Sequence, residues 1–133
     1  MAVFVDTSAL LALVNAQDLF HPAAREALTS LREAREPLVT TNYVLVEALA
    51  LIQRRQGMGA ATIFQANFVP ILTVAWVDEP VHRAAVAALL TAGRRELSLV
   101  DCVSFEVMRE RGIAQAFSFD ADFAVAGFEL LPA

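Results

Sequence analysis

The chain has 133 residues, of which 57% are hydrophobic, and it carries a net charge of −5 and a single cysteine, Cys102. This length suits one domain around one hydrophobic core, so we treat residues 1–133 as a single domain. A lone cysteine excludes an internal disulfide, and no apolar run reaches the roughly 18–20 residues that a membrane span needs. We therefore expect a cytoplasmic protein that does not enter a membrane.

The expected elements alternate between strands and helices along the whole chain. Val3–Val5 has the continuous apolar character of a strand that is buried on both faces, and it runs directly into polar residues. Further strands are predicted at Leu38–Thr40, Ile71–Val77, Ala116–Phe119 and Phe128–Leu131. Helices are predicted at Ala9–Val14, Pro22–Ala34, Tyr43–Gln56, Ala60–Phe68, Val81–Thr91 and Leu99–Arg111, with Asn42 and Ser98 as N-caps.

This alternation predicts an α/β fold, a three-layer α/β/α sandwich with a mainly parallel sheet of about five strands. The helix Tyr43–Gln56 is apolar on nearly all sides, so we expect it to be buried. Phe64, Phe68 and Trp76 have the spacing of core residues, and we expect them to pack in the core rather than to stack on bases.

Five acidic residues fall where such a fold would gather them. Asp6 and Asp120 end strands, Glu47 lies in the second turn of a helix, Asp101 lies in the first turn of another, and Asp122 lies in a loop. Reactive groups of parallel sheets lie beyond the carboxyl ends of the strands, so these acids are expected at one edge. Capping is the alternative role for Asp6 and Asp101, and solvation is the alternative for Asp122. Glu47 is the hardest to explain without a site, because burial of an unpaired carboxylate is costly.

Carboxylates that lie a few Å apart repel one another unless a cation compensates their charge. An all-oxygen set without His or Cys selects a hard cation, Mg²⁺ or Mn²⁺. Such ions activate water and bind phosphoryl oxygens, which is the chemistry of phosphodiester hydrolysis. The sequence therefore predicts a metal-dependent hydrolase of phosphodiester bonds.

Four segments resemble, in order and spacing, the motifs of PIN domains, and they are most similar to the VapC-type toxins of toxin–antitoxin pairs. These segments are Val5–Leu10, Asn42–Glu47, Leu97–Ser104 and Phe117–Phe123. The resemblance covers the whole chain and implies a metal-dependent endoribonuclease with a five-stranded parallel sheet. A PIN-like module that binds protein or RNA without cleaving it is the alternative, which a missing acid would favour, and none is missing.

The resemblance also implies roles for individual residues. The acidic quartet that would hold one or two Mg²⁺ or Mn²⁺ ions comprises Asp6, Glu47, Asp101 and Asp120. Asp122 resembles the accessory acid, and Thr7 and Ser104 resemble the hydroxyls that orient the first and third acids. Val100 stands where a hydroxyl is usual, so one hydrogen bond to the third acid is expected to be absent.

The expected partners are an RNA substrate, a small antitoxin protein and a second copy of the chain. Arg94 and Arg95 are the best candidates for phosphate contacts, with a solvated turn as the alternative. The high apolar content suggests surface beyond one core, which a symmetric homodimer and an antitoxin would cover. The alternative explanation for the high apolar content is an alanine-rich composition. The best apolar anchors for these interfaces are Leu19, Phe20, Ile63, Phe64 and Phe68.

Overall fold

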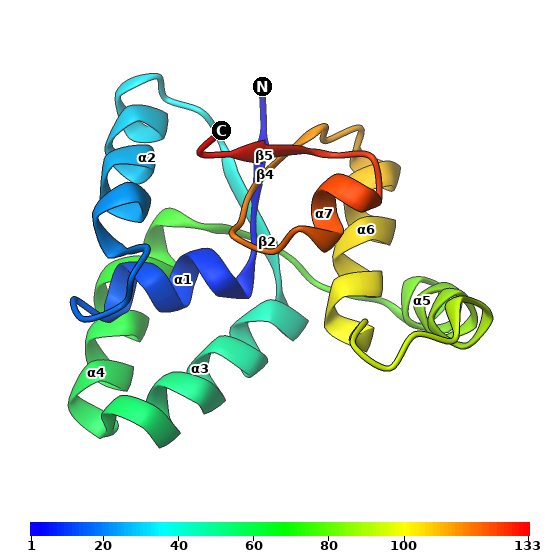
Figure 1. The fold of residues 1–133 in the computed structure, drawn as a ribbon, viewed down its shortest axis with the longest axis horizontal. Coiled ribbons are helices and arrows are strands. Elements are labelled where there is room, and N and C mark those ends of the chain that lie inside the picture. The colour runs from blue at the N-terminus through cyan, green and yellow to red at the C-terminus, as the bar shows by residue number, and fades with distance from the viewer.

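The apolar residues Val3–Val5 form β1, the central strand of a five-stranded parallel sheet (Figure 1). The computed structural model describes residues 1–133. The sheet has the order β3-β2-β1-β4-β5, and each neighbouring pair is parallel. Its other strands are β2 (Leu38–Thr41), β3 (Thr73–Ala75), β4 (Gln115–Phe117) and β5 (Glu129–Leu131). The three residues of β1 are at most 1% exposed, as expected for a strand covered on both faces.

Helices cover both faces of this sheet, so the predicted three-layer α/β/α fold is confirmed. In Figure 1, α1 and α2 lie on one side of the strands, and α6 and α7 lie on the other. The helices are α1 (Thr7–Val14), α2 (His21–Glu33), α3 (Asn42–Gln56), α4 (Met58–Ile63), α5 (Glu79–Ala92), α6 (Leu99–Arg111) and α7 (Asp122–Val125). None of them combines the length and the apolar character that crossing a membrane requires.

The strand register brings the polar residues that follow β1 and β4 to one edge of the sheet. Val5 pairs with Phe117, and Phe117 pairs with Leu131, so these strands end at the same level. The Asp6 backbone N–H donates to Phe117 O at 3.1 Å, which extends the sheet by one residue. Asp6 and Asp120 therefore lie at the same carboxyl edge, as the sequence predicts.

Aromatic packing ties the two helices on the α6 side to the central strand. The Phe123 ring of α7 lies 6.3 Å from the Phe4 ring of β1 and packs edge-on against Phe105 of α6 at 4.9 Å. Phe4 and Phe123 are completely buried. Because Phe123 follows Asp122 directly, this packing fixes the start of α7 against the sheet.

Four predictions about burial and element boundaries are wrong. Strand β3 is shorter than Ile71–Val77, because a 3₁₀ turn occupies Val69–Ile71 before it. Trp76 lies beyond the end of β3 and is 76% exposed rather than in the core. Helix α3 buries only the face that carries Val44, Ala48 and Ile52. The predicted helix Ala60–Phe68 is divided into α4 and a π-helical turn, Phe64–Phe68, in which Phe64 is buried as expected and Phe68 is half-buried.

The N-cap of α3 is Thr41 and not Asn42. The Thr41 hydroxyl accepts a hydrogen bond from the Val44 backbone N–H at 3.1 Å, which satisfies one of the free donors of the first turn. Asn42 is already helical, and its Oδ1 accepts from the Val77 backbone N–H at 2.8 Å. Asn42 therefore connects α3 to the chain that leaves β3.

Replacing Thr41 with Ala should lower the free energy of unfolding by about 1 kcal/mol, because the cap is lost. The matched control is Thr62→Ala in α4, whose exposed hydroxyl bonds only to Met58 O of its own helix. Urea denaturation of both variants measures the difference. An equal effect of the two substitutions would contradict the assignment of Thr41 as the cap.

Candidate functional site

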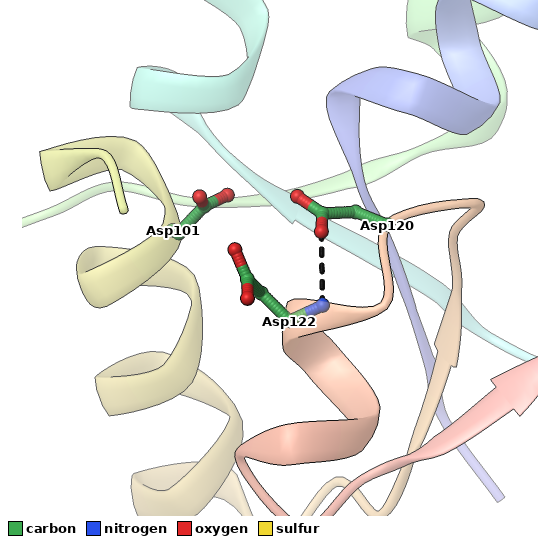
Figure 2. Close-up of side chains that lie close together, drawn as sticks. All are labelled: Asp101, Asp120 and Asp122. Atoms are coloured by element: carbon green, nitrogen blue, oxygen red, sulfur yellow. Dashed lines mark hydrogen bonds between the residues drawn. The ribbon is translucent and has the colours of Figure 1, made fainter. Parts of the chain in front are cut away.

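Three carboxylates from different segments point toward one another at the carboxyl edge of the sheet (Figure 2). Asp101 lies in the first turn of α6, Asp120 in the turn that follows β4, and Asp122 at the start of α7. One carboxylate oxygen of each lies within 4.8 Å of the others. The Asp122 backbone N–H donates to Asp120 Oδ1 at 2.9 Å, which fixes these two acids relative to each other.

Asp6 lies beside this group and is held by two serine hydroxyls. Ser8 Oγ donates to Asp6 Oδ2 at 2.8 Å, and Ser118 Oγ donates to the same oxygen at 2.9 Å. Ser118 Oγ also accepts from the Asp120 backbone N–H at 3.0 Å. Ser118, which lies 112 residues from Asp6 in the sequence, therefore links the first acid to the fourth.

Glu47 lies at the same edge of the sheet, but its carboxylate is not part of the group of three. It is half-buried in the second turn of α3, which begins directly after β2. Glu47 lines a hollow of about 300 Å³ together with Tyr43, Val46 and Val100. Val100, which precedes Asp101 in α6, forms one wall of this hollow.

The hydroxyls that orient the acids differ from those that the resemblance implied. Thr7 Oγ1 is buried and has no hydrogen-bond partner, and Ser104 Oγ donates to Val100 O of its own helix at 2.9 Å. Asp6 is oriented by Ser8 and Ser118, which were missed. In the sequence, Ser8 and Ser118 each lie two residues from a strand-ending acid, Asp6 and Asp120, and this spacing could have identified them. The approach of Ser118 to Asp6, however, depends on the pairing of β1 with β4.

Capping and site roles coincide for the first and third acids. Asp101 and Ser98 form the expected capping box, in which the Asp101 N–H donates to Ser98 Oγ at 3.0 Å and Ser98 N–H donates to Asp101 Oδ2 at 3.4 Å. Asp6 caps α1 by accepting from the Ser8 N–H at 3.4 Å. An acid of this site can therefore cap a helix and also take part in the cluster, because its carboxylate has two oxygens that can accept separately.

Burial disfavours the charged forms of two of these acids, Asp6 and Asp101. Burial raises the pKa of Asp6, although hydrogen bonds from Ser8 and Ser118 lower it in part. Burial also raises the pKa of Asp101 to about 6, and the charges of Asp6 and Asp120 add to this increase. The influence of Asp6 on Asp101 places its charge within electrostatic range of the cluster.

One arginine already faces the cluster. Arg94 Nη2 lies 3.1 Å from Asp122 Oδ1, so the loop between α5 and α6 brings a positive charge to the site. Arg95 is exposed and forms no ion pair. Of the two arginines predicted to contact phosphate, only Arg94 is therefore placed against an acid of the site.

The cluster fits a small hard cation. Oxygen ligands of Mg²⁺ lie about 2.0–2.1 Å from the ion, so opposite ligands are about 4.2 Å apart. The carboxylate oxygens of the group lie within 4.8 Å of one another, and small side-chain rotations would bring them to that spacing. Because all the donors are carboxylate oxygens, the chemistry of the set suits Mg²⁺ or Mn²⁺.

Comparison with known proteins gives matches over nearly the whole chain. A family model described as the PIN domain matches residues 3–129. The chain is 40% identical over 128 residues to the protein named 23S rRNA-specific endonuclease VapC20 in two strains of Mycobacterium tuberculosis, CDC 1551 / Oshkosh and ATCC 25618 / H37Rv. The match covers 95% of this chain and 95% of each relative.

Two solved structures share the fold. The crystal structure of Mycobacterium tuberculosis VapC20, described as a sarcin-ricin loop cleaving toxin, matches with a TM-score of 0.84 and 38% identity over 96% of each chain. The crystal structure of FitAcB from Neisseria gonorrhoeae matches with a TM-score of 0.69 and 14% identity, covering 96% of this chain and 95% of that one. The second likeness concerns the fold alone.

The raised pKa of Asp101 predicts how the stability of the metal-free protein depends on pH. Between about pH 4 and pH 6 the folded state holds a proton on Asp101 that the unfolded chain, with a pKa near 3.8, has released. The free energy of unfolding should therefore fall as the pH rises through this range. Asp101→Asn, which cannot ionise, should flatten the decline, and thermal unfolding in chelator at several pH values measures it.

The control for this experiment is Asp78→Asn, because Asp78 caps the exposed start of α5 and Asn caps equally well. Its profile should follow that of the parent protein. Parallel profiles for Asp101→Asn and the parent would show that Asp101 does not carry the effect.

Proposed function

The chain belongs to the PIN domain family, and from this premise we propose that it is a metal-dependent endoribonuclease, the toxin of a toxin–antitoxin pair. The observation that carries the proposal is the convergence of Asp101, Asp120 and Asp122 within 4.8 Å, with Asp6 hydrogen-bonded to the same turn. A protein with only a structural role has no reason to hold several carboxylates so close together, because their repulsion is unfavourable.

We assign the role of each residue from its position in the site. Asp101 and Asp120 would hold Mg²⁺ or Mn²⁺ together with Asp6 or Asp122, and Glu47 borders the cluster from α3. The bound ion supplies activation of water and neutralisation of phosphoryl oxygens. Ser8 and Ser118 keep the Asp6 carboxylate in one orientation, so that it does not have to be ordered when substrate arrives.

Two arginines of the loop that precedes α6 are proposed to contact the RNA backbone. The Arg94 guanidinium already lies at the cluster, and its planar group can bind a phosphate through two parallel hydrogen bonds. Arg95 is exposed next to it. The relative VapC20 is named a 23S rRNA-specific endonuclease, and we infer that ribosomal RNA is the first substrate to test for this chain.

Purified protein should cleave RNA in the presence of Mg²⁺ or Mn²⁺ and stop when a chelator is added. Asp6→Asn and Asp120→Asn preserve side-chain size but remove a charge from the cluster, so the cleavage rate should fall at least about 100-fold, the scale of losing one charge-stabilising group. Gel analysis of ribosomal RNA fragments measures the rate. Asp78→Asn, which lies outside the cluster, should cleave like the parent.

Fast cleavage by Asp6→Asn at matched metal concentration would show that the carboxylate assignment is wrong. Cleavage that is insensitive to chelator would contradict the metal dependence. Folding of each variant is checked by circular dichroism, so that loss of activity is not confused with loss of structure.

We further propose that the chain forms a homodimer, binds a small antitoxin protein and acts in the cytoplasm. Large apolar side chains on its surface support the first two proposals. Val46, Met58, Ile63, Trp76, Leu90 and Val125 are each at least 52% exposed. Apolar surface of this kind marks protein interaction sites. Of the residues expected at an interface, Leu19, Phe20 and Ile63 are exposed, whereas Phe64 is buried and cannot contribute.

A stable dimer interface buries roughly 1,000 Å² or more in total. Light scattering of the purified protein at micromolar concentration should therefore give about twice the chain mass of 14.4 kDa. A single species of 14.4 kDa at this concentration would contradict the dimer.

A further inference from the structure

Two aromatic side chains lie face to face immediately beside Asp120. The rings of Phe20 and Phe119 are 4.6 Å apart at their centroids, and their planes differ by only 13°. Phe119 precedes Asp120, and its backbone N–H donates to Ser8 Oγ at 2.9 Å. The hydroxyl that orients Asp6 therefore also holds the backbone that carries one of these rings.

Phe20 remains 45% exposed although one face of its ring is covered by Phe119. Large aromatic side chains contribute most to stability when they are buried, so this exposure has no structural benefit. The ring presents a flat apolar surface at the carboxyl edge of the sheet, on the side where the strand β4 leads into Asp120.

The loop that carries Phe20 is held by its own hydrogen bonds. The Phe20 backbone N–H donates to Asp18 Oδ1 at 2.8 Å, and the His21 N–H donates to Asp18 O at 3.0 Å. His21 Nδ1 lies 2.7 Å from Ala12 O of α1, which ties the start of α2 to the neighbouring helix. The position of the Phe20 ring is thus set before any ligand arrives, which reduces the entropic cost of binding.

Helix α2, which follows Phe20, carries two arginines that form no ion pair. Arg25 and Arg32 lie seven residues apart, about two helical turns, and line one hollow of about 420 Å³. Neither forms an ion pair, because the pairs in the protein are Met1–Glu36, Arg83–Glu79 and Arg94–Asp122. The hollow is also lined by Leu13, His21, Leu28, Thr29 and Phe68. In a chain with a net charge of −5, two free guanidinium groups in one hollow favour an anionic ligand.

We propose that α2 and its preceding loop form a subsite for single-stranded RNA, in which a base stacks on Phe20 and backbone phosphates lie against Arg25 and Arg32. The inference rests on the proposed ribonuclease function. Aromatic rings for bases combined with arginines for phosphates are how proteins recognise unpaired nucleotides. A purely apolar antitoxin segment would use the ring but not the two arginines, so the combination favours RNA.

The test measures binding of a short fluorescent single-stranded RNA to metal-free protein over a series of salt concentrations. Phe20→Ala should weaken binding about tenfold, the order expected for loss of one stacked base. Phe20→Leu retains an apolar side chain against Phe119 but has no aromatic face, so it should weaken binding as well. Phe20→Trp should restore it. The matched control is Leu19→Ala, which removes an 86% exposed neighbour and should change nothing.

Salt dependence separates the stacking surface from the phosphate contacts. Each phosphate contact with a single strand contributes about 0.7 to the slope of log affinity against log salt concentration. Arg25→Gln combined with Arg32→Gln should reduce the slope by about 1.4, whereas Phe20→Ala should leave it unchanged. Arg54→Gln combined with Arg55→Gln, an equal charge change at the exposed end of α3, should not alter the slope.

Unchanged RNA binding by Phe20→Ala and Phe20→Leu, or an unchanged slope for the α2 double variant, would overturn the subsite. If Phe20→Ala lost capture of the antitoxin but still bound RNA like the parent, the RNA subsite would be overturned. The Phe20 ring would then belong to a protein interface. Failure of the parent protein to cleave RNA with Mg²⁺ or Mn²⁺ would instead count against the proposed function, and the binding measurements without metal distinguish the two failures.

Discussion

Repulsion between carboxylates is the constraint on which this structure is built. Asp6 is 3% exposed and Asp101 is 9% exposed, and burial raises the pKa of both. The charges of Asp6 and Asp120 raise the pKa of Asp101 further. The hydroxyls of Ser8 and Ser118 donate to the Asp6 carboxylate, and the Ser98 backbone N–H donates to the Asp101 carboxylate. In the metal-free protein, repulsion between these carboxylates lowers stability, and a divalent cation would relieve it. Functional sites often reduce the stability of a protein in this way.

Apolar packing in the core offsets the stability that is lost through repulsion between the carboxylates at the sheet edge. The central strand is fully covered, and Phe4, Phe105 and Phe123 join it to α6 and α7. Asp101 lies in the first turn of α6 and Asp122 is the first residue of α7. The packing of Phe105 and Phe123, which follow them in the same helices, therefore determines where the two carboxylates lie. Rigid support of this kind is what keeps a catalytic constellation in one geometry.

Charge is distributed unevenly over the molecule in a way that suits an RNA substrate. The clustered acids, which fit a hard cation, are concentrated at the sheet edge, and Arg94 faces Asp122 from the loop before α6. Arg25 and Arg32 are free on α2, on a flank that begins next to the exposed Phe20 ring. An acidic protein can therefore bind a polyanion, because its net charge does not describe the local field at each surface.

The sequence by itself determined the alternation of strands and helices, the buried central strand, and the edge at which Asp6, Asp101 and Asp120 would lie. These follow from local apolar runs, from capping residues such as Ser98, and from the geometry of parallel sheets. Only the tertiary structure decided that Asp122 rather than Glu47 completes the closest group, that Ser118 rather than Thr7 holds Asp6, and that Trp76 is exposed. It also decided that Phe20 stacks on Phe119. Contacts of this kind join residues that are distant along the chain, and side-chain packing between elements sets them to within an ångström, which no local pattern records.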